Sequence, residues 1–141
     1  MEFVCDAPGG KAWFRIETEA EAATESELMG HAVEKHFRRA RDAAAASYDP
    51  GDVPFVERDI GRAAHLRRAM PVFLTLRDAE GTALVTAMLP AAGRPEGADL
   101  RPVIVGRENA DPYPAHGEAI QALGQHLGQT LDRALCYPYR R

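Results

Sequence analysis

The chain has 141 residues and a formal net charge of −4, and 45% of its residues are hydrophobic against 27% charged. This is the balance of an ordinary globular protein, and the length predicts one domain, residues 1–141, able to bury a core without disulfides or metals. No apolar run approaches the ~20 residues of a membrane span, and the negative charge argues against a protein that coats nucleic acid.

The first residues and the two cysteines bear on the cellular compartment that we expect for the protein. The first residues, Met-Glu-Phe-Val-Cys-Asp, lack the basic stretch and long apolar run of a secretory signal, so none is expected. Cys5 and Cys136 form no C-x-x-C pair. We therefore expect two reduced thiols in a cytoplasmic protein, and isolated cysteines of this kind are usually small buried hydrophobes.

The first third of the chain predicts a hairpin followed by one long helix. Phe3–Cys5 and Trp13–Ile16 are rich in β-formers, and Pro8-Gly9-Gly10 between them is typical of a turn. A capping box at Thr18 or at Thr24 begins the helix, which should run to about Tyr48. Its apolar side comprises Met29, Val33, His36, Phe37, Ala40, Ala44 and Ser47.

A second helix is predicted from Pro54 to Ala69, because proline is favoured in a first helical turn. Its apolar side comprises Val56, Ile60, Ala63, Leu66 and Met70. Its basic side comprises Arg58, Arg62, His65 and Arg68. Pro71 then ends the helical stretch.

The second half predicts three more strands and a last helix. Residues 72–77 and 82–89 flank the turn Asp78-Ala79-Glu80-Gly81, and a third strand follows at 102–105 after a loop at 90–99. The last helix is expected from about Ala115 to Leu135. Its core stripe is Ile120, Leu123, Leu127, Leu131 and Ala134, and its uncharged polar row is Gln121, Gln125 and Gln129.

These elements predict an α+β fold: an antiparallel sheet of about five strands with three helices, in the order β-β-α-α-β-β-β-α. The strand at residues 82–89 is apolar on both faces, so we expect a central strand with helix on at least one side.

One pattern on the long helix has the spacing of a metal site. Glu27, His31 and Glu34 would share one helical face, where imidazole and carboxylates can hold a metal. Arg38 lies on the same face and would compete for the carboxylates. A solvated charged face is therefore the favoured interpretation, and we predict no metal and no cofactor.

An anionic ligand is the better-supported expectation. Arginine binds phosphate or carboxylate through paired contacts, and a helix N-terminus attracts anions. If a pocket exists, we expect it between the sheet and five residues from the second helix and the entry to the last helix: Arg62, His65, Arg107, Tyr113 and His116. The alternatives are docking of the arginines against the acidic N-terminal stretch and a merely rigid turn at Asp111-Pro-Tyr-Pro.

Catalytic signatures are weak. His36 lies on the apolar side of the long helix, where a core-edge histidine bonded to a backbone carbonyl is the usual arrangement. His36, His65 and His116 are nevertheless candidate acids or bases, since imidazole titrates near neutrality. No Gly-x-Ser-x-Gly elbow supports a hydrolase triad.

The leading hypothesis is a cytoplasmic, non-catalytic module, expected as a homodimer, that binds an anionic small molecule or a protein partner and neither nucleic acid nor membrane. An enzyme using histidine acid–base chemistry on an anionic substrate is the first alternative. The second is an assembly protein that associates through the Gln121/Gln125/Gln129 row or the Tyr137–Tyr139 tail.

Overall fold

The computed structural model describes residues 1–91, 101–136 and 138, without the side chain of Val56. The predicted loop at 90–99 therefore lies largely outside the described residues, as do Tyr137 and Tyr139. The elements run in the order β1 (Glu2–Ala7), β2 (Lys11–Arg15), α1 (Glu19–Met29), α2 (Val33–Ala46), α3 (Phe55–Ala69), β3 (Val72–Arg77), β4 (Ala83–Leu89), β5 (Val103–Gly106), η1 (Arg107–Asn109), α4 (Tyr113–Leu127) and η2 (Arg133–Leu135). Here η1 and η2 are single 3₁₀ turns.

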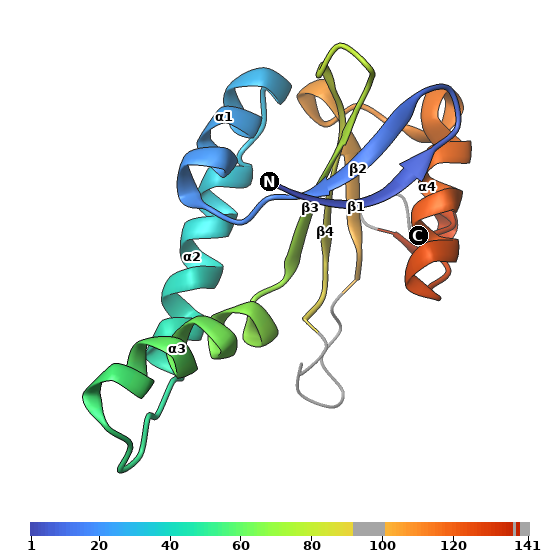
Figure 1. The fold of residues 1–141 in the computed structure, drawn as a ribbon. Coiled ribbons are helices and arrows are strands. Elements are labelled where there is room, and N and C mark those ends of the chain that lie inside the picture. The colour runs from blue at the N-terminus through green and yellow to red at the C-terminus, as the bar shows by residue number, and fades with distance from the viewer. Residues whose placement is uncertain (92–100, 137, 139–141) are drawn as a thin grey trace.

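The five strands form one antiparallel sheet in the order β1-β2-β3-β4-β5 (Figure 1). Tight turns join β1 to β2 and β3 to β4, and in the second turn the Asp78 carboxylate accepts the backbone N–H groups of Glu80 and Thr82. The long connection from β2 to β3 holds α1, α2 and α3. The predicted α+β class and five-stranded antiparallel sheet are confirmed.

The long helix predicted from Thr18 or Thr24 is two helices, so the described residues contain four α-helices rather than three. Thr18 caps α1 in a complete capping box with Glu21. Gly30 ends α1 in the left-handed conformation at φ 64, which an L side chain rarely adopts. The chain then turns, and the Glu34 N–H donates to Ser26 Oγ at 2.8 Å as α2 begins.

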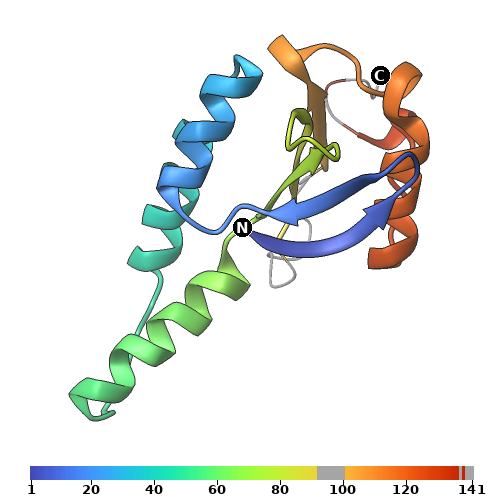
Figure 2. The ribbon, with the colours of Figure 1, turned by 45° about the horizontal axis from the view of Figure 1, so that its top comes forward.

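Each face of the sheet has its own core, with α4 on one side and α1 and α2 on the other (Figure 2). The core beneath α4 includes Trp13, Leu74, Leu76, Val85, Ile104, Ile120 and Leu123. Trp13 also donates its indole N–H to the carbonyl of Ala119 at 2.8 Å. The opposite core includes Ile16, Ala22, Val33, Phe37, Met70 and Phe73. Alternation along β3 sends Leu74 and Phe73 to opposite cores, as the strand pleat requires.

Two helices differ from their predicted form. α4 ends at Gly128, which adopts φ 67, so Leu131 reaches the core from the following segment and Gln129 lies outside the helix. The helix α3 begins after Pro54, close to the predicted start. Its predicted apolar side packs only in part, because the first half of α3 extends, beside α2, beyond the edge of the sheet (Figures 1 and 2). Ile60 is consequently 69% exposed, while Leu66 and Met70 pack. Within the described residues, no helix combines the length and apolarity needed to cross a bilayer.

Candidate functional site

A buried carboxylate lies at the centre of the α1–sheet contact. Glu25 projects from α1 on the same face as Ala22 and Met29, and its side chain is completely buried. The guanidinium of Arg77, on β3, donates to Glu25 Oε1 at 2.7 Å, and only 12% of the Arg77 side chain is exposed. Removing two charges from water is costly, so this ion pair needs further hydrogen bonds to be tolerated.

Two threonines on adjacent strands supply those bonds. Thr75 and Thr86 are register partners in β3 and β4, and both are buried. Thr75 Oγ1 accepts from Arg77 Nε at 3.0 Å, and Thr86 donates its hydroxyl to Glu25 Oε2 at 2.5 Å. The ion pair and both hydroxyls therefore form one continuous network beneath α1.

His31 extends this network towards a cavity. Its Nε2 lies 2.9 Å from Thr86 Oγ1. The hydroxyl hydrogen of Thr86 is already given to the Glu25 carboxylate, which can only accept, so His31 donates through Nε2–H. The chain His31–Thr86–Glu25–Arg77 thus fixes the tautomer of an imidazole that follows the left-handed Gly30.

The cavity beside His31, the His31 cavity, has a volume of about 490 Å³. It lies between the loop joining α1 to α2 and the face of the sheet formed by β3, β4 and β5. Its apolar walls come from Val33, Phe73, Met88, Val103 and Val105, and its polar side chains are His31, His36, Thr86 and Asn109; Ala32 and Pro138 complete the lining. The volume and the few polar groups on apolar walls are typical of small-molecule sites.

The electrostatics of the His31 cavity are simple. Burial lowers the pKa of His31 from its ordinary value of 6.5, and the negative charge of Glu25 opposes this in part. None of the described residues that line the cavity is Asp, Glu, Lys or Arg. The lining itself can therefore carry either no charge or the positive charge of its imidazoles.

The edge of the cavity formed by η1 holds an unusual backbone. Glu108 and Asn109 adopt φ 55 and φ 62, the left-handed region that side chains other than glycine enter at a cost. Asn109 lines the cavity, and a Cβ placed on Gly30 would lie 3.2 Å from Glu108 Cγ. Such strained segments persist only where surrounding structure holds them, and they occur often at ligand sites.

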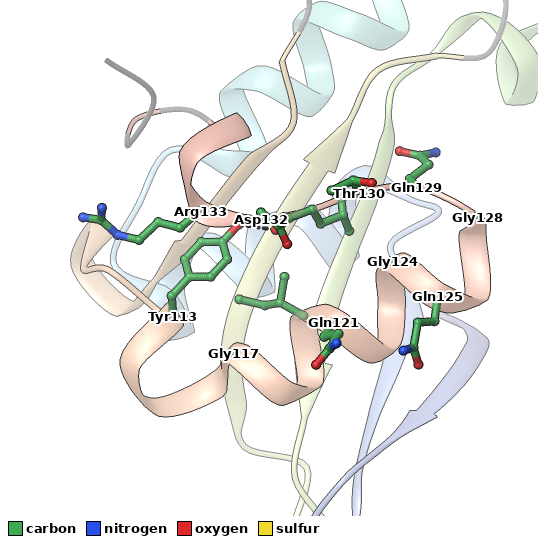
Figure 3. Close-up of a pocket in the computed structure, with 12 residues that line it drawn as sticks. Tyr113, Gly117, Gln121, Gly124, Gln125, Gly128, Gln129, Thr130, Asp132 and Arg133 are labelled. Carbon is green, nitrogen blue, oxygen red and sulfur yellow. Dashed lines mark hydrogen bonds between the residues drawn. The ribbon is translucent and has the colours of Figure 1, made fainter.

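A second concave surface lies on the opposite face of the sheet, between α4 and the segment that follows it (Figure 3). This α4 groove has a volume of about 560 Å³ and is lined by Gly117, Gly124 and Gly128 with Gln121, Gln125 and Gln129. The Tyr113 hydroxyl donates to the carbonyl of Leu131 at 2.8 Å and ties the two sides together. The predicted glutamine row therefore borders a groove.

The structure does not gather the five predicted ligand residues into one pocket. Arg62 and His65 lie on α3, and His65 Nε2 is within hydrogen-bonding distance of Ser47 Oγ (2.9 Å) and the carbonyl of Ala44 (3.1 Å) on the α2 side. Those contacts give His65 a structural role in joining α2 to α3. Arg62 is exposed to solvent.

The other three lie around β5 and α4. Arg107 is exposed in η1, two residues before Asn109 of the His31 cavity. Tyr113 and His116 are in the first turn of α4, on the opposite face of the sheet. Burial, together with the nearby charge of Lys11, lowers the pKa of His116. The sheet therefore separates this pair from Arg62 and His65, and ligand binding by each of the five residues stays a prediction.

The three residues with the spacing of a metal site, Glu27, His31 and Glu34, are also separated. The helix α1 ends at Gly30, so Glu27 and Glu34 lie on two different helices. Glu27 is exposed on α1, and Glu34 on α2 accepts a hydrogen bond from Arg38 at 2.9 Å. His31 is bonded to Thr86 instead. No group of three potential metal ligands occurs among the described residues.

The remaining candidate groups also have defined environments. His36 is exposed at the His31 cavity, so the prediction of a core-edge position for it is wrong. Cys5 and Cys136 are free thiols that pack in the core beneath α4. Burial raises the pKa of both thiols, which keeps them protonated and weakly nucleophilic.

Glu25, Arg77 and Thr86 are site residues that the sequence did not lead us to predict. The available signal was polarity at positions that the apolar patterns assign to the core. Glu25 follows Ala22 by three residues and precedes Met29 by four, and Thr86 lies in a strand apolar on both faces. A buried polar group needs partners, so such positions mark polar networks.

Comparison of the chain with protein-family models, curated proteins and solved structures found no match.

Proposed function

We propose that the protein is a non-catalytic cytoplasmic module that binds a small, predominantly apolar molecule carrying one carboxylate group in the His31 cavity. The observation that carries this proposal is a partly buried imidazole, held by a buried Thr86–Glu25–Arg77 network, in the wall of a mostly apolar cavity. A buried ion pair costs the fold desolvation energy, so we infer that the Glu25–Arg77 pair serves to position Thr86 and His31.

The chemistry of the lining supports the ligand class. Five apolar side chains would contact the body of the ligand, and burying apolar area contributes about 25 cal/mol per Å². Among the described residues that line the cavity, the imidazoles of His31 and His36 are the ionisable groups, so the lining can become positive but not negative. A carboxylate would gain a charge-assisted hydrogen bond from a protonated imidazole, whereas a cation would be repelled.

Calorimetric titration tests the proposal, with benzoate as the probe and benzyl alcohol as its neutral counterpart. Because an imidazolium binds a carboxylate better than a neutral ring does, benzoate should bind about tenfold more tightly at pH ~6 than at pH ~8. Benzyl alcohol should bind weakly, with little dependence on pH. Equal pH profiles for the two probes, or no binding of benzoate, would contradict the proposal.

Two cavity variants localise the binding. Met88→Trp replaces an unbranched side chain in the wall of the His31 cavity by a bulkier indole ring and should abolish benzoate binding. The control is Gly117→Leu, which fills open space at the α4 groove on the opposite face and should leave benzoate affinity unchanged. His31→Gln should retain weak binding and lose most of its pH dependence.

Acid–base catalysis at the same cavity is the second candidate function. It is favoured by the His31–Thr86–Glu25 chain, since an imidazole with a fixed tautomer and a lowered pKa suits a general base. Chemical turnover of a bound carboxylate, followed by NMR and abolished in His31→Gln, would establish catalysis in place of simple binding.

A further inference from the structure

The outer surface of α3 lacks a partner within the described part of the chain. One side of the helix packs on α2 through His65 and Leu66, while its first half extends away from the sheet (Figure 2). Ile60, which is 69% exposed, lies in this first half.

Four exposed residues form a stripe along this outer surface: Glu57, Ile60, Ala64 and Arg68. Their spacings of three, four and four residues keep them on one helical face. The order along the stripe is acidic, apolar, small and basic. Within the described residues, neither Glu57 nor Arg68 forms an ion pair.

We propose that two copies of the chain associate through this α3 stripe, with the two helices antiparallel about a two-fold axis near residue 62. In that arrangement Ile60 of each copy packs against Ala64 of the other, because the two positions lie at equal distances on either side of the axis. Glu57 of each copy then faces Arg68 of the other. One helix face thus supplies both halves of a self-complementary contact, as a two-fold interface requires.

Charge complementarity selects a second copy of the chain as the occupant. With two antiparallel copies of α3, Glu57 of each copy faces Arg68 of the other, which gives two contacts between opposite charges. With two parallel copies, Glu57 would face Glu57 and Arg68 would face Arg68. Ala64 lets the helix axes approach closely, so Ile60 can fill the space above it. The contact is small for a stable interface, which predicts a weak dimer that exchanges with monomer.

Charge reversal tests this geometry, with the dissociation constant measured by sedimentation over a wide concentration range. Glu57→Arg sets two pairs of like positive charges across the interface, and Arg68→Glu sets two negative pairs. Each variant alone should weaken self-association by about tenfold or more. An equimolar mixture of the two variants should associate again, because both charge contacts of the heterodimer then join an arginine to a glutamate.

Both substitutions are at exposed positions, and circular dichroism verifies that each variant keeps its helix content. Glu27→Arg, the same charge change on the exposed face of α1, is the control and should leave the dissociation constant unchanged. A wild-type chain that stays monomeric at every concentration would overturn the proposal. Single variants that dimerise normally, or a mixture that does not associate, would also overturn it.

Discussion

Glu25 and Glu27 show how strongly the environment of a carboxylate determines its role. They are two residues apart on α1, but Glu25 is fully buried against Arg77 while Glu27 is exposed to solvent. Losing one partner of a buried ion pair leaves the other charge uncompensated. The two positions therefore form a matched pair for substitution.

We predict that Glu25→Gln lowers the free energy of unfolding by about 3 kcal/mol, because it breaks the buried ion pair with Arg77. Glu27→Gln should change it by less than about 0.5 kcal/mol, as is usual for surface positions. Urea denaturation of the two variants measures the difference. Equal effects would show that the buried network contributes little to stability.

His31 predicts a pH dependence of stability. Burial lowers its pKa below 6.5 in the folded chain, and unfolding restores the ordinary value. Between these two values the unfolded state binds more protons, so the free energy of unfolding falls as the pH falls through this window. Above the ordinary pKa, His31 contributes no such dependence.

Denaturation of wild type and His31→Gln from pH ~5 to ~8 isolates this contribution. The variant should lose less stability than wild type as the pH falls below 6.5. The ring resonances of His31 in the wild type should titrate with a midpoint below that value. A midpoint above it, or parallel stability curves for the two proteins, would disagree with a partly buried neutral imidazole.

At the scale of elements, the break between α1 and α2 builds the site. Gly30 adopts φ 64, and the turn after it places His31 against β4. We predict that Gly30→Ala lowers the free energy of unfolding by about 1–2 kcal/mol, because alanine is strained in the left-handed region. It should also weaken benzoate binding through displacement of His31.

Gly117→Ala on α4 is the matched control. A Cβ there meets open space, and alanine is favoured over glycine in a helix by about 0.5–1 kcal/mol. This variant should be neutral or more stable in thermal unfolding, with benzoate affinity unchanged. A Gly30→Ala protein as stable as Gly117→Ala would contradict the role given to the left-handed turn.

The elements that sequence predicted best are those that local chemistry determines. The capping box at Thr18, the turn at Asp78 and the proline before α3 each act within a few residues. The break at Gly30 was missed because amphipathic periodicity continues through it, from Met29 to Val33 and Phe37. The end of α4 was missed because Leu131 keeps a helical spacing while packing from a non-helical segment.

At the scale of the whole molecule, the candidate site depends on which face of the sheet each helix covers. Periodicity identifies the apolar side of a helix but not the surface that it packs on. Arg62 and His116 were expected at one pocket, but α3 and α4, which carry them, lie on opposite sides of the sheet. Conversely, Glu25, Arg77 and Thr86 meet although 61 residues separate the first and last of them.

The most direct test of the central claim is NMR of the wild-type chain during titration with benzoate. We predict saturable shifts of the Met88 methyl and His31 ring resonances, because both side chains line the His31 cavity. The side-chain amide resonances of Gln121 and Gln125, on the α4 groove, should stay in place. Shifts confined to those glutamines, or no shift at Met88 and His31, would contradict the assignment of the His31 cavity as the ligand site.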